Sequence, residues 1–484
     1  MNTSSRATFH TAKLAGELLW GEKESTLSQR DGPGWLRSQL LRAPSFNHGF
    51  DALNRRRFRS RLPFLLVISS VAIVALAYIF GMAWWQSRDA AFFGADELWV
   101  PRSIDVLITL WLLWIGSAIG SFLNVVAWRM PRGVSINGRS RCPRCETALK
   151  PRDNFPVLGW LMLGGRCRMC KLPISPRYPI VEAAVGVSLA LVGIAELYRL
   201  AIPHQWNHWH GGPFWAPVVD RFVIIVLIYH AVAVATSWAL GLVRLDKQRL
   251  PVNLTVFALL AVVVPMLAYP TLMIVPWQTA RPSGWIPDGL HIEAVMRVVS
   301  ALVAAGLLGR SLASGLCPTA DPKLDPLGQG TTRLLDLVVV IAVPAVVVGW
   351  QVIPAVVVVA SLIALLLRKV VRLQSDMFGF FSLAMPIALT LQIVLWRRLH
   401  GAAFWPSDET SHWVILLWAA AALASPAWLR EPPSKPERIS FGTEDEPTEE
   451  KPTEEKPTEE KPGTDEPAAE KVMPGDWDDS RESR

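Results

Sequence analysis

Four cysteines carry the clearest chemical signal in the sequence. They form two Cys-x-x-Cys pairs, Cys142 with Cys145 and Cys167 with Cys170, with 21 residues between the pairs. Each pair can form a turn that directs two thiolates toward one ion, and two such turns complete a tetrahedral shell of four sulfurs. Because a closed shell leaves no position open for a substrate, the spacing predicts a structural Zn²⁺.

Redox dithiols or disulfides are the alternative use of these thiols. A cytoplasmic position, which the charge pattern predicts below, disfavours stable disulfides. The fifth cysteine, Cys317, stands alone near the end of an apolar block and is expected to be a small buried residue. The arginines around the pairs would offset the negative charge of a zinc tetrathiolate: Arg139, Arg141, Arg144, Arg166 and Arg168.

A second group of possible metal ligands is less specific. His204, His208 and His210 fall in a loop between apolar blocks and are spaced so that they could bind a metal. The tryptophans beside them favour an aromatic belt at the membrane interface instead. The sequence contains no Gly-x-Gly-x-x-Gly or Gly-Lys-Ser/Thr motif, so a nucleotide-binding site lacks support.

The elements that must position these residues are membrane helices. The 484 residues are 51% hydrophobic and 18% charged, which is too apolar for an ordinary soluble protein. The apolar residues gather in blocks of about 17–25, the length that crosses a hydrocarbon core. We therefore predict an all-α polytopic membrane protein of about ten transmembrane helices. The expected spans are 63–86, 104–127, a span from Tyr178, 216–243, 251–270, 290–313, 334–349, 352–368, 377–396 and 412–429.

Charge sets the expected orientation. Basic residues concentrate in the loops between alternate spans, which marks those loops and both termini as cytoplasmic. This distribution disfavours nucleic-acid binding, because no compact basic domain is present. Residues 431–484 hold 18 acidic and 8 basic side chains and repeat Pro-Thr-Glu-Glu-Lys, so they are expected to be disordered. The predicted domains are a polar cytoplasmic extension 1–62, two spans 63–130, the cysteine loop 131–177, a helical domain 178–430 and the acidic tail 431–484.

The region around the cysteines resembles the N-terminal domain of the prepilin peptidase family, membrane aspartic peptidases that process type IV pilins and type II secretion pseudopilins. The resemblance rests on motifs in the right order: Gly120-Ser-Phe-Leu-Asn124, the cysteine pairs, Asp153-Asn-Phe-Pro-Val-Leu-Gly-Trp160, Gly165-Arg-Cys167 and Ile174-Ser-Pro-Arg-Tyr-Pro-Ile-Val-Glu182. A weaker similarity extends the resemblance over about 110–396, through Leu245–Pro251, Gly349-Trp350-Gln351 and Met377–Ala384.

The resemblance implies a function at the cytoplasmic face of the bacterial inner membrane. Family members cut a short basic leader from prepilin or pseudopilin substrates held in the lipid bilayer. Many also methylate the new N-terminus with S-adenosylmethionine. Cleavage uses two aspartates, because one carboxylate must activate a water while the other, protonated, polarises the peptide carbonyl.

The sequence departs from the family pattern at both aspartates. The first is expected seven residues before Pro251, where the chain has Arg244. The second is expected after a Gly-x-Gly motif, where the chain has Thr331. Counting from Gly349 instead places the second aspartate beside Asp336.

Two explanations follow for the candidate catalytic residues. Asp246 and Asp336 can have replaced the usual pair, each slightly displaced. Alternatively the chain has no dyad and is a binding or assembly factor for pilus or secretion components. A guanidinium cannot act as a base, and a shift of two residues turns a helical side chain by about 200°. Arg244 would then pair with Asp246 or lie at the lipid headgroups. A transporter is a third class, for which the sequence shows no internal repeat.

Glu182 is a further candidate because it begins a predicted span. An acid there is a functional hypothesis by default. The plainer interpretation is a carboxylate at the interface, paired with Arg177.

Overall fold

Helices form at each of the ten apolar blocks, and the residues described in the computed structural model include no strand beyond two isolated bridges. The all-α prediction is therefore confirmed. The long helices are α4 (Leu62–Asp89), α5 (Trp99–Arg129), α7 (Arg177–Leu197), α8 (Arg221–Leu245), α9 (Val252–Ala268), α10 (Leu290–Leu316), α11 (Gln329–Val348), α12 (Ile353–Val370), α13 (Met377–His400) and α14 (His412–Ala424). Short helices are η1 (Met130–Arg132), η2 (Pro151–Asp153), α6 (Leu158–Met162), η4 (Pro270–Leu272) and α15 (Pro426–Leu429).

The described residues are 62–89, 94–142, 144–201, 217, 219–274, 277, 289–317, 329–371, 375–407 and 410–430. All of them belong to one unit, Met1–Glu431. Several expectations concern residues outside these ranges: the polar extension before residue 62, the histidines His204, His208 and His210, and the acidic tail after residue 430.

Within the described ranges, eight helices are long and apolar enough to cross a membrane. The ninth apolar helix, α9, has 17 residues, or about 25 Å at 1.5 Å per residue, which is near the lower limit for a span. α11 has 20 residues and is not one of the eight. The protein is thus a multi-pass membrane protein.

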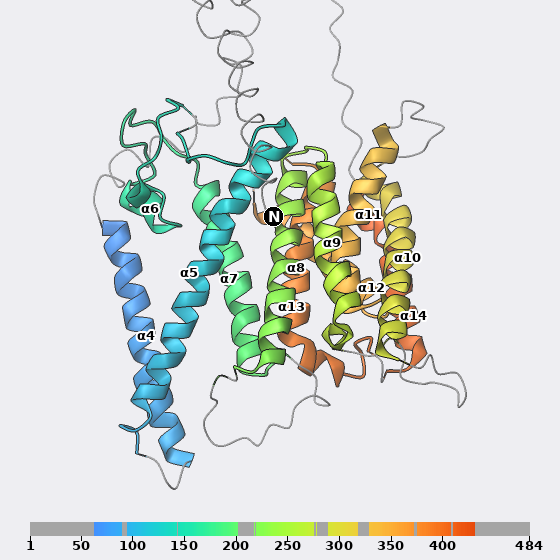
Figure 1. Ribbon diagram of the computed structural model, residues 1–484, viewed down its shortest axis with the longest axis horizontal. Coiled ribbons are helices and arrows are strands. Elements are labelled where there is room, and N and C mark those ends of the chain that lie inside the picture. Colours follow the sequence, from blue (N-terminus) through green and yellow to red (C-terminus); the bar gives the residue numbers. More distant parts are fainter. Residues whose placement is uncertain are drawn as a thin grey trace, which may run out of the picture. The chain divides into compact units, whose positions relative to one another are not determined.

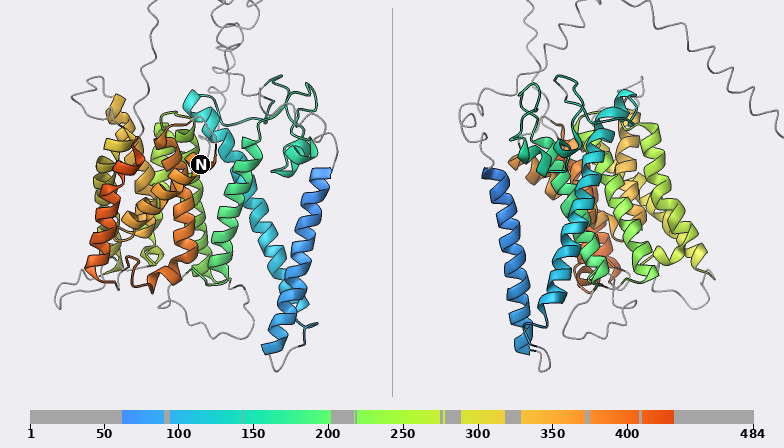
Figure 2. Two further views of the ribbon diagram at one scale, coloured as in Figure 1. Left: turned by 180° about the vertical axis from the view of Figure 1, so that it is seen from behind. Right: turned by 60° about the vertical axis from the view of Figure 1, so that its left-hand side comes forward.

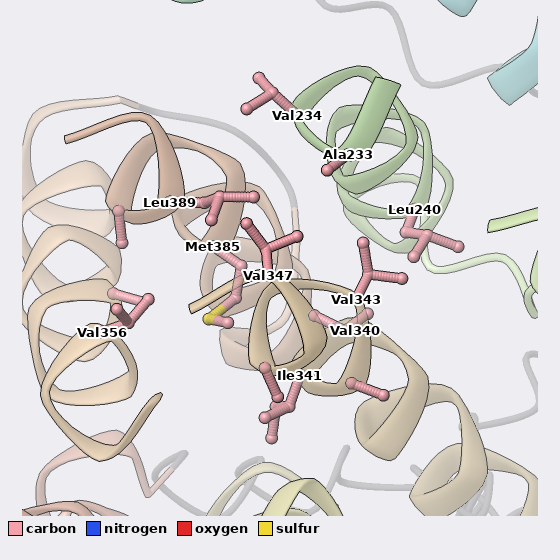
Figure 3. Packing of buried hydrophobic residues seen from close by; sticks show 14 of the residues in the cluster. Ala233, Val234, Leu240, Val340, Ile341, Val343, Val347, Val356, Met385 and Leu389 are labelled. Carbon is pink, nitrogen blue, oxygen red and sulfur yellow. The ribbon is translucent and has the colours of Figure 1, made fainter. Parts of the chain in front are cut away.

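α11 packs against five other helices, α8, α9, α10, α12 and α13. Its buried residues Val340, Val343 and Val347 recur at intervals of three and four, which places them on one face of the helix. Figure 3 shows this face between Leu240 of α8 and Met385 of α13. Small β-branched side chains let three helices approach one another closely here.

A tight turn at Gly349–Gln351 joins α11 to α12. Gly349 has φ +90°, a conformation that side-chain-bearing residues rarely adopt. The buried guanidinium of Arg297 on α10 donates from Nε to the carbonyl of Val346 at 3.3 Å and from Nη2 to that of Val347 at 2.6 Å. These carbonyls have no partner inside α11, so Arg297 satisfies the end of that helix.

α5 and α7 cross at small residues. A Cβ added to Gly116 would lie 2.9 Å from Cα of Gly186, and one added to Gly120 would lie 2.9 Å from Cα of Glu182. The backbones therefore touch, which requires glycine on at least one helix at each level. Among the described residues α4 packs mainly against α5 and α6, and the most apolar part of α4 has no buried residue.

α5 begins at Trp99, earlier than the expected span start at 104. The predicted span therefore leaves out Arg102, although it contains Asp105. In the structure both are buried and Arg102 Nη1 lies 2.8 Å from Asp105 Oδ2, so the pair can extend the helix.

The cysteine loop, residues 131–176, lies at one end of the bundle (Figure 2). We call this end the loop end and the opposite one the distal end. α5, α8 and α12 end at the loop end, and α7, α11 and α13 begin there (Figure 1).

Candidate functional site

The four cysteines converge on one point. Cys142 Sγ lies 3.9 Å from Cys170 Sγ, and Cys145 Sγ lies 3.9 Å from Cys167 Sγ. All four sulfurs are within 4.8 Å of one another, and the cysteines are free rather than disulfide-bonded. Four sulfurs at 2.3 Å from one ion would be about 3.8 Å apart in a tetrahedron, so the cluster can hold a metal ion.

The two pairs have the same backbone fold. The amide of Glu146 donates to the Cys142 carbonyl at 2.9 Å, and the amide of Lys171 donates to the Cys167 carbonyl at 3.0 Å. Both Glu146 and Lys171 follow their second cysteine with positive φ, 53° and 61°. This repeated turn aims two sulfurs the same way. Hydrogen bonding from Thr147 lowers the pKa of the Cys145 thiol to about 6, which favours the thiolate form that binds metal.

An ion pair fixes the second cysteine turn to the Asp153–Trp160 segment. Arg168 donates to both carboxylate oxygens of Asp153, at 2.9 Å from Nε and 2.6 Å from Nη2. Asp153 is buried, and the hydrogen bond from Arg168 holds the pKa of its carboxyl below the ordinary value. Gly159 is required beside it, because a Cβ would lie 2.6 Å from the Asp153 carbonyl oxygen.

Glu182 anchors the same segment to the bundle. Its Oε2 accepts a hydrogen bond of 2.7 Å from the amide of Val157. Val157 has φ 58° and ψ −55°, a strained conformation for a β-branched residue. The expected pairing of Glu182 with Arg177 is wrong, because Arg177 has another partner.

That partner is Asp246, which caps the C-terminus of α8. Arg177 Nη2 donates to Asp246 Oδ2 at 2.9 Å, and its Nη1 donates to Oδ1. Both oxygens of Asp246 are thereby held by one guanidinium. This two-pronged contact joins the start of α7 to the end of α8.

Arg244 points the other way from Asp246, toward α11. Its Nη1 lies 3.6 Å from Asp336 Oδ2, and the amide of Leu250 donates to the same oxygen at 3.2 Å. The expected pairing of Arg244 with Asp246, and its alternative position at the headgroups, are therefore both wrong. Arg244 is 2% exposed and lies over the ring of Phe378 at 4.1 Å from its centroid.

The start of α13 closes this polar site. Asp376 Oδ1 accepts from the amide of Gly379 at 2.8 Å and caps the helix, and its Oδ2 accepts from Arg333 Nη2 at 3.1 Å. Ser375 Oγ donates to the carbonyl of Leu245 at 2.7 Å. α8, α11 and α13 thus meet at the loop end around the Arg244–Asp336 pair.

The structure does not pair the two candidate catalytic residues. Among the described residues, Asp246 and Asp336 share no hydrogen bond and no arginine, since Arg177 contacts the first and Arg244 the second. Instead Arg244, which occupies the position expected for the first aspartate, contacts Asp336, which lies beside the position expected for the second.

The comparison with known proteins matches the part of the chain that contains the cysteine loop. Residues 114–195, which contain the cysteine loop, match the Bacterial Peptidase A24 N-terminal domain. This part of the chain is similar to the N-terminal domain of the prepilin peptidase family. It is 36% identical over 163 residues to the Prepilin leader peptidase/N-methyltransferase of Myxococcus xanthus, covering 34% of this chain and 41% of that protein.

Other relatives of this family match a shorter part of the chain. The Prepilin leader peptidase/N-methyltransferase of Klebsiella pneumoniae is 46% identical over 85 residues, or 16% of this chain and 37% of the relative. The Type 4 prepilin-like proteins leader peptide-processing enzyme of Escherichia coli O78:H11 is 39% identical over 113 residues, or 19% and 40%. The matches thus span about two fifths of the length of these family members. No solved structure matches the chain.

Sequence reasoning missed four buried ionisable groups that the structure reveals, in two pairs. Asp105 pairs with Arg102, and Glu196 Oε1 lies 2.8 Å from Nδ1 of His230 between α7 and α8. Their position in the sequence could have revealed them, because an ionisable residue inside an apolar block needs a partner.

Proposed function

We propose that this chain is a prepilin-binding member of the family that does not cleave leader peptides with an aspartate dyad. The observation that supports this is the ion pair of Arg244 and Asp336, with Nη1 and Oδ2 3.6 Å apart. This ion pair lies where the family resemblance leads us to expect two carboxylates.

An arginine beside an aspartate cannot carry out the two-carboxylate reaction. The dyad needs one acid to give a proton and one carboxylate to accept it, whereas a guanidinium keeps its proton at physiological pH. Asp246 does not supply the missing group, because Arg177 holds both of its oxygens.

The proposal that this chain binds prepilins rests on the family motifs that it retains around the cysteine loop. The family motifs around the cysteine loop contact one another: Glu182 holds Val157, and Arg168 holds Asp153. Asn124 Nδ2 also donates to the carbonyl of Tyr178 at 3.3 Å. The relatives are named for prepilins, so a prepilin is the partner we propose for this retained half.

The test is cleavage and binding of one prepilin in the same membranes. A prepilin cut by the Myxococcus xanthus relative is co-expressed with this chain, with that relative as the positive control. We expect no cleavage by this chain, but specific crosslinking of the prepilin to it. Cleavage that Asp246→Ala or Asp336→Ala abolishes would instead establish the competing proposal, a peptidase with these two catalytic aspartates. Absence of crosslinking would contradict prepilin binding.

Two further proposals concern ligands and orientation. The chemistry of four thiolates supports Zn²⁺ in the cysteine cluster, and the relatives' names make S-adenosylmethionine a candidate cofactor to test by binding of the labelled compound. The arginine-rich loop end supports a cytoplasmic loop and cytoplasmic termini in the bacterial inner membrane. Labelling of added cysteines from either side of intact cells tests that orientation.

A further inference from the structure

The two cysteine turns share a backbone fold but expose different side chains. We call residues 141–148 the first turn and residues 166–173 the second, because an isolated bridge joins the two end residues of each. Residues at equivalent positions, such as Cys142 and Cys167, can therefore be compared one by one.

The second turn exposes apolar side chains where the first exposes polar ones. Met169 corresponds to Arg144, and Leu172 corresponds to Thr147. Met169 is 64% exposed and Leu172 is 47% exposed, although neither belongs to a membrane-spanning helix. Contact with an apolar phase would remove this area from water, so the second turn favours such a contact.

The charges of the two turns also differ. Lys171 of the second turn corresponds to Glu146 of the first, and both are exposed. The charge of Arg168 is compensated by its ion pair with Asp153. The exposed side chains of Lys171 and Arg166 therefore give the second turn a positive surface, which fits an anionic partner.

The second turn is fixed to the part of the loop that contacts the membrane helices. Arg168 donates to both carboxylate oxygens of Asp153, at 2.9 Å and 2.6 Å. Directly after the turn, the carbonyl of Ile174 accepts a hydrogen bond of 3.0 Å from Trp160 Nε1. These contacts hold the second turn to the Asp153–Trp160 segment and to α6.

This segment lies at the level of the membrane surface. α6 packs against α4 at the start of that helix (Figure 1). α4 begins at Leu62, directly after Arg59 and Arg61 in the sequence, and basic residues before a span mark the headgroup region. Phe155 also stacks on Trp114 within the apolar span of α5, with 6.4 Å between the ring centroids. The second turn is thus held beside the lipid headgroups.

We propose that the second cysteine turn binds the anionic phospholipid surface of the membrane that holds the helices. Met169 and Leu172 enter the region between headgroups and acyl chains, as the apolar side chains of interfacial segments do. Lys171 and Arg166 lie against the lipid phosphates. An acidic protein would match the charges, but lipid is present beside the turn at high local concentration. The turn is then a membrane contact of the cysteine loop in addition to its covalent connections to α5 and α7.

The charges set the size of the expected lipid preference. Each basic residue near an anionic membrane surface favours binding by about fivefold. Lys171→Glu removes one cation, adds one anion and gives the second turn the residue that the first has at this position. We therefore expect Lys171→Glu to weaken lipid contact by at least about fivefold. Glu146→Lys is the matched change in the first turn and should leave the lipid contact of the second unchanged.

The experiment is photocrosslinking of the full chain in nanodiscs. The photoreactive residue p-benzoylphenylalanine replaces Met169 in one chain and its counterpart Arg144 in another. The nanodiscs hold either phosphatidylcholine alone or equal parts of phosphatidylcholine and phosphatidylglycerol, and mass spectrometry identifies the lipid adducts. With phosphatidylglycerol present, we expect at least about fivefold more adduct at position 169 than at position 144, and at least about fivefold more than in phosphatidylcholine alone.

Three outcomes would overturn the proposal. Equal yields at positions 169 and 144, or no lipid adduct at 169, would exclude the second turn as a lipid contact. Adducts at 169 that form equally in both kinds of nanodisc would exclude an anionic partner. Adducts at 169 with a protein in place of lipid, after illumination of native membranes, would exclude lipid as the partner. These comparisons need no charge variant, so a poorly folded Lys171→Glu chain does not affect them.

Discussion

At the scale of single residues, the ion pair of Arg244 and Asp336 makes a prediction about stability. Their side chains are 3% and 10% exposed, so each charge depends on the other for compensation. Arg244→Met should lower the free energy of unfolding by about 3–5 kcal/mol, because it leaves the Asp336 carboxylate buried beside an apolar chain. Thermal unfolding in detergent, followed by fluorescence, measures the loss.

The control for this prediction removes both charges. Arg244→Met combined with Asp336→Leu should recover most of the lost stability, since replacing a buried ion pair with apolar residues is often nearly neutral. A double variant no more stable than the single one would show that the two side chains do not interact.

The pairing of Asp153 with Arg168 predicts that the stability of the protein depends on pH. The pKa of Asp153 is lowered in the fold by the hydrogen bond from Arg168, so the pairing stabilises the protein above the unfolded pKa of about 3.9. The stabilisation is lost as the pH falls through the lower pKa of the folded state. Because Arg168 is 41% exposed, we expect Asp153→Asn to cost only about 1 kcal/mol at pH 7.

The measurement is the difference in melting temperature between Asp153→Asn and wild type from pH 7 to pH 3. The difference should shrink toward zero in acid, and taking it cancels any common effect of zinc loss. Asp96→Asn, at an exposed site, serves as the control and should match the wild type throughout. A difference independent of pH would mean that the Asp153 charge is not what stabilises the loop.

At the scale of helices, the crossing of α5 and α7 predicts unequal effects of two glycine substitutions. A Cβ at Gly186 would lie 2.3 Å from Ser117 Oγ and 3.0 Å from the Leu113 carbonyl oxygen, whereas one at Gly306 of α10 would meet nothing within 4 Å. Gly186→Ala should therefore destabilise by about 1–3 kcal/mol. Gly306→Ala should be neutral or stabilise by up to about 1 kcal/mol, because alanine favours helix. Melting temperatures compare the two, and equal shifts would contradict the close crossing.

Hydropathy predicted the helices well because the hydrocarbon core fixes their length. It placed the start of α5 five residues late, since it counts Arg102 as an unpaired charge. In the structure Arg102 pairs with Asp105, which also accepts a hydrogen bond from Tyr198, a residue 93 positions away. No local pattern contains that partner.

One part of the candidate site could be predicted from the sequence and another part could not. The cysteine cluster could be predicted because each Cys-x-x-Cys turn is local and only two turns had to meet. The partner of Arg244 could not, because it depends on how α8 and α11 pack. The expected pairing of Arg244 with Asp246 was wrong for the same reason, since the two side chains contact Asp336 and Arg177 respectively.

At the scale of the whole unit, the cysteine loop and the helical bundle are stabilised by different means. The loop has little apolar core of its own, so we expect it to depend on a metal held by its four thiols, whereas the bundle buries a continuous cluster of apolar side chains. Glu182 with Val157 and Arg177 with Asp246 connect the two. Zinc removal should therefore loosen the loop and leave the bundle folded.

Hydrogen exchange tests this in the Cys142→Ser variant. Zinc content should fall from one ion per chain to less than about a tenth, because a three-thiolate site is incomplete. The amides of 144–176 should then exchange at least tenfold faster while those of α8 and α13 are unchanged. Cys317→Ser, which removes a buried thiol far along the chain from the cluster, should keep both zinc and protection. If α8 lost protection together with the loop, the bundle itself would depend on the metal, and the loop would be part of one cooperative fold rather than a separately stabilised cap.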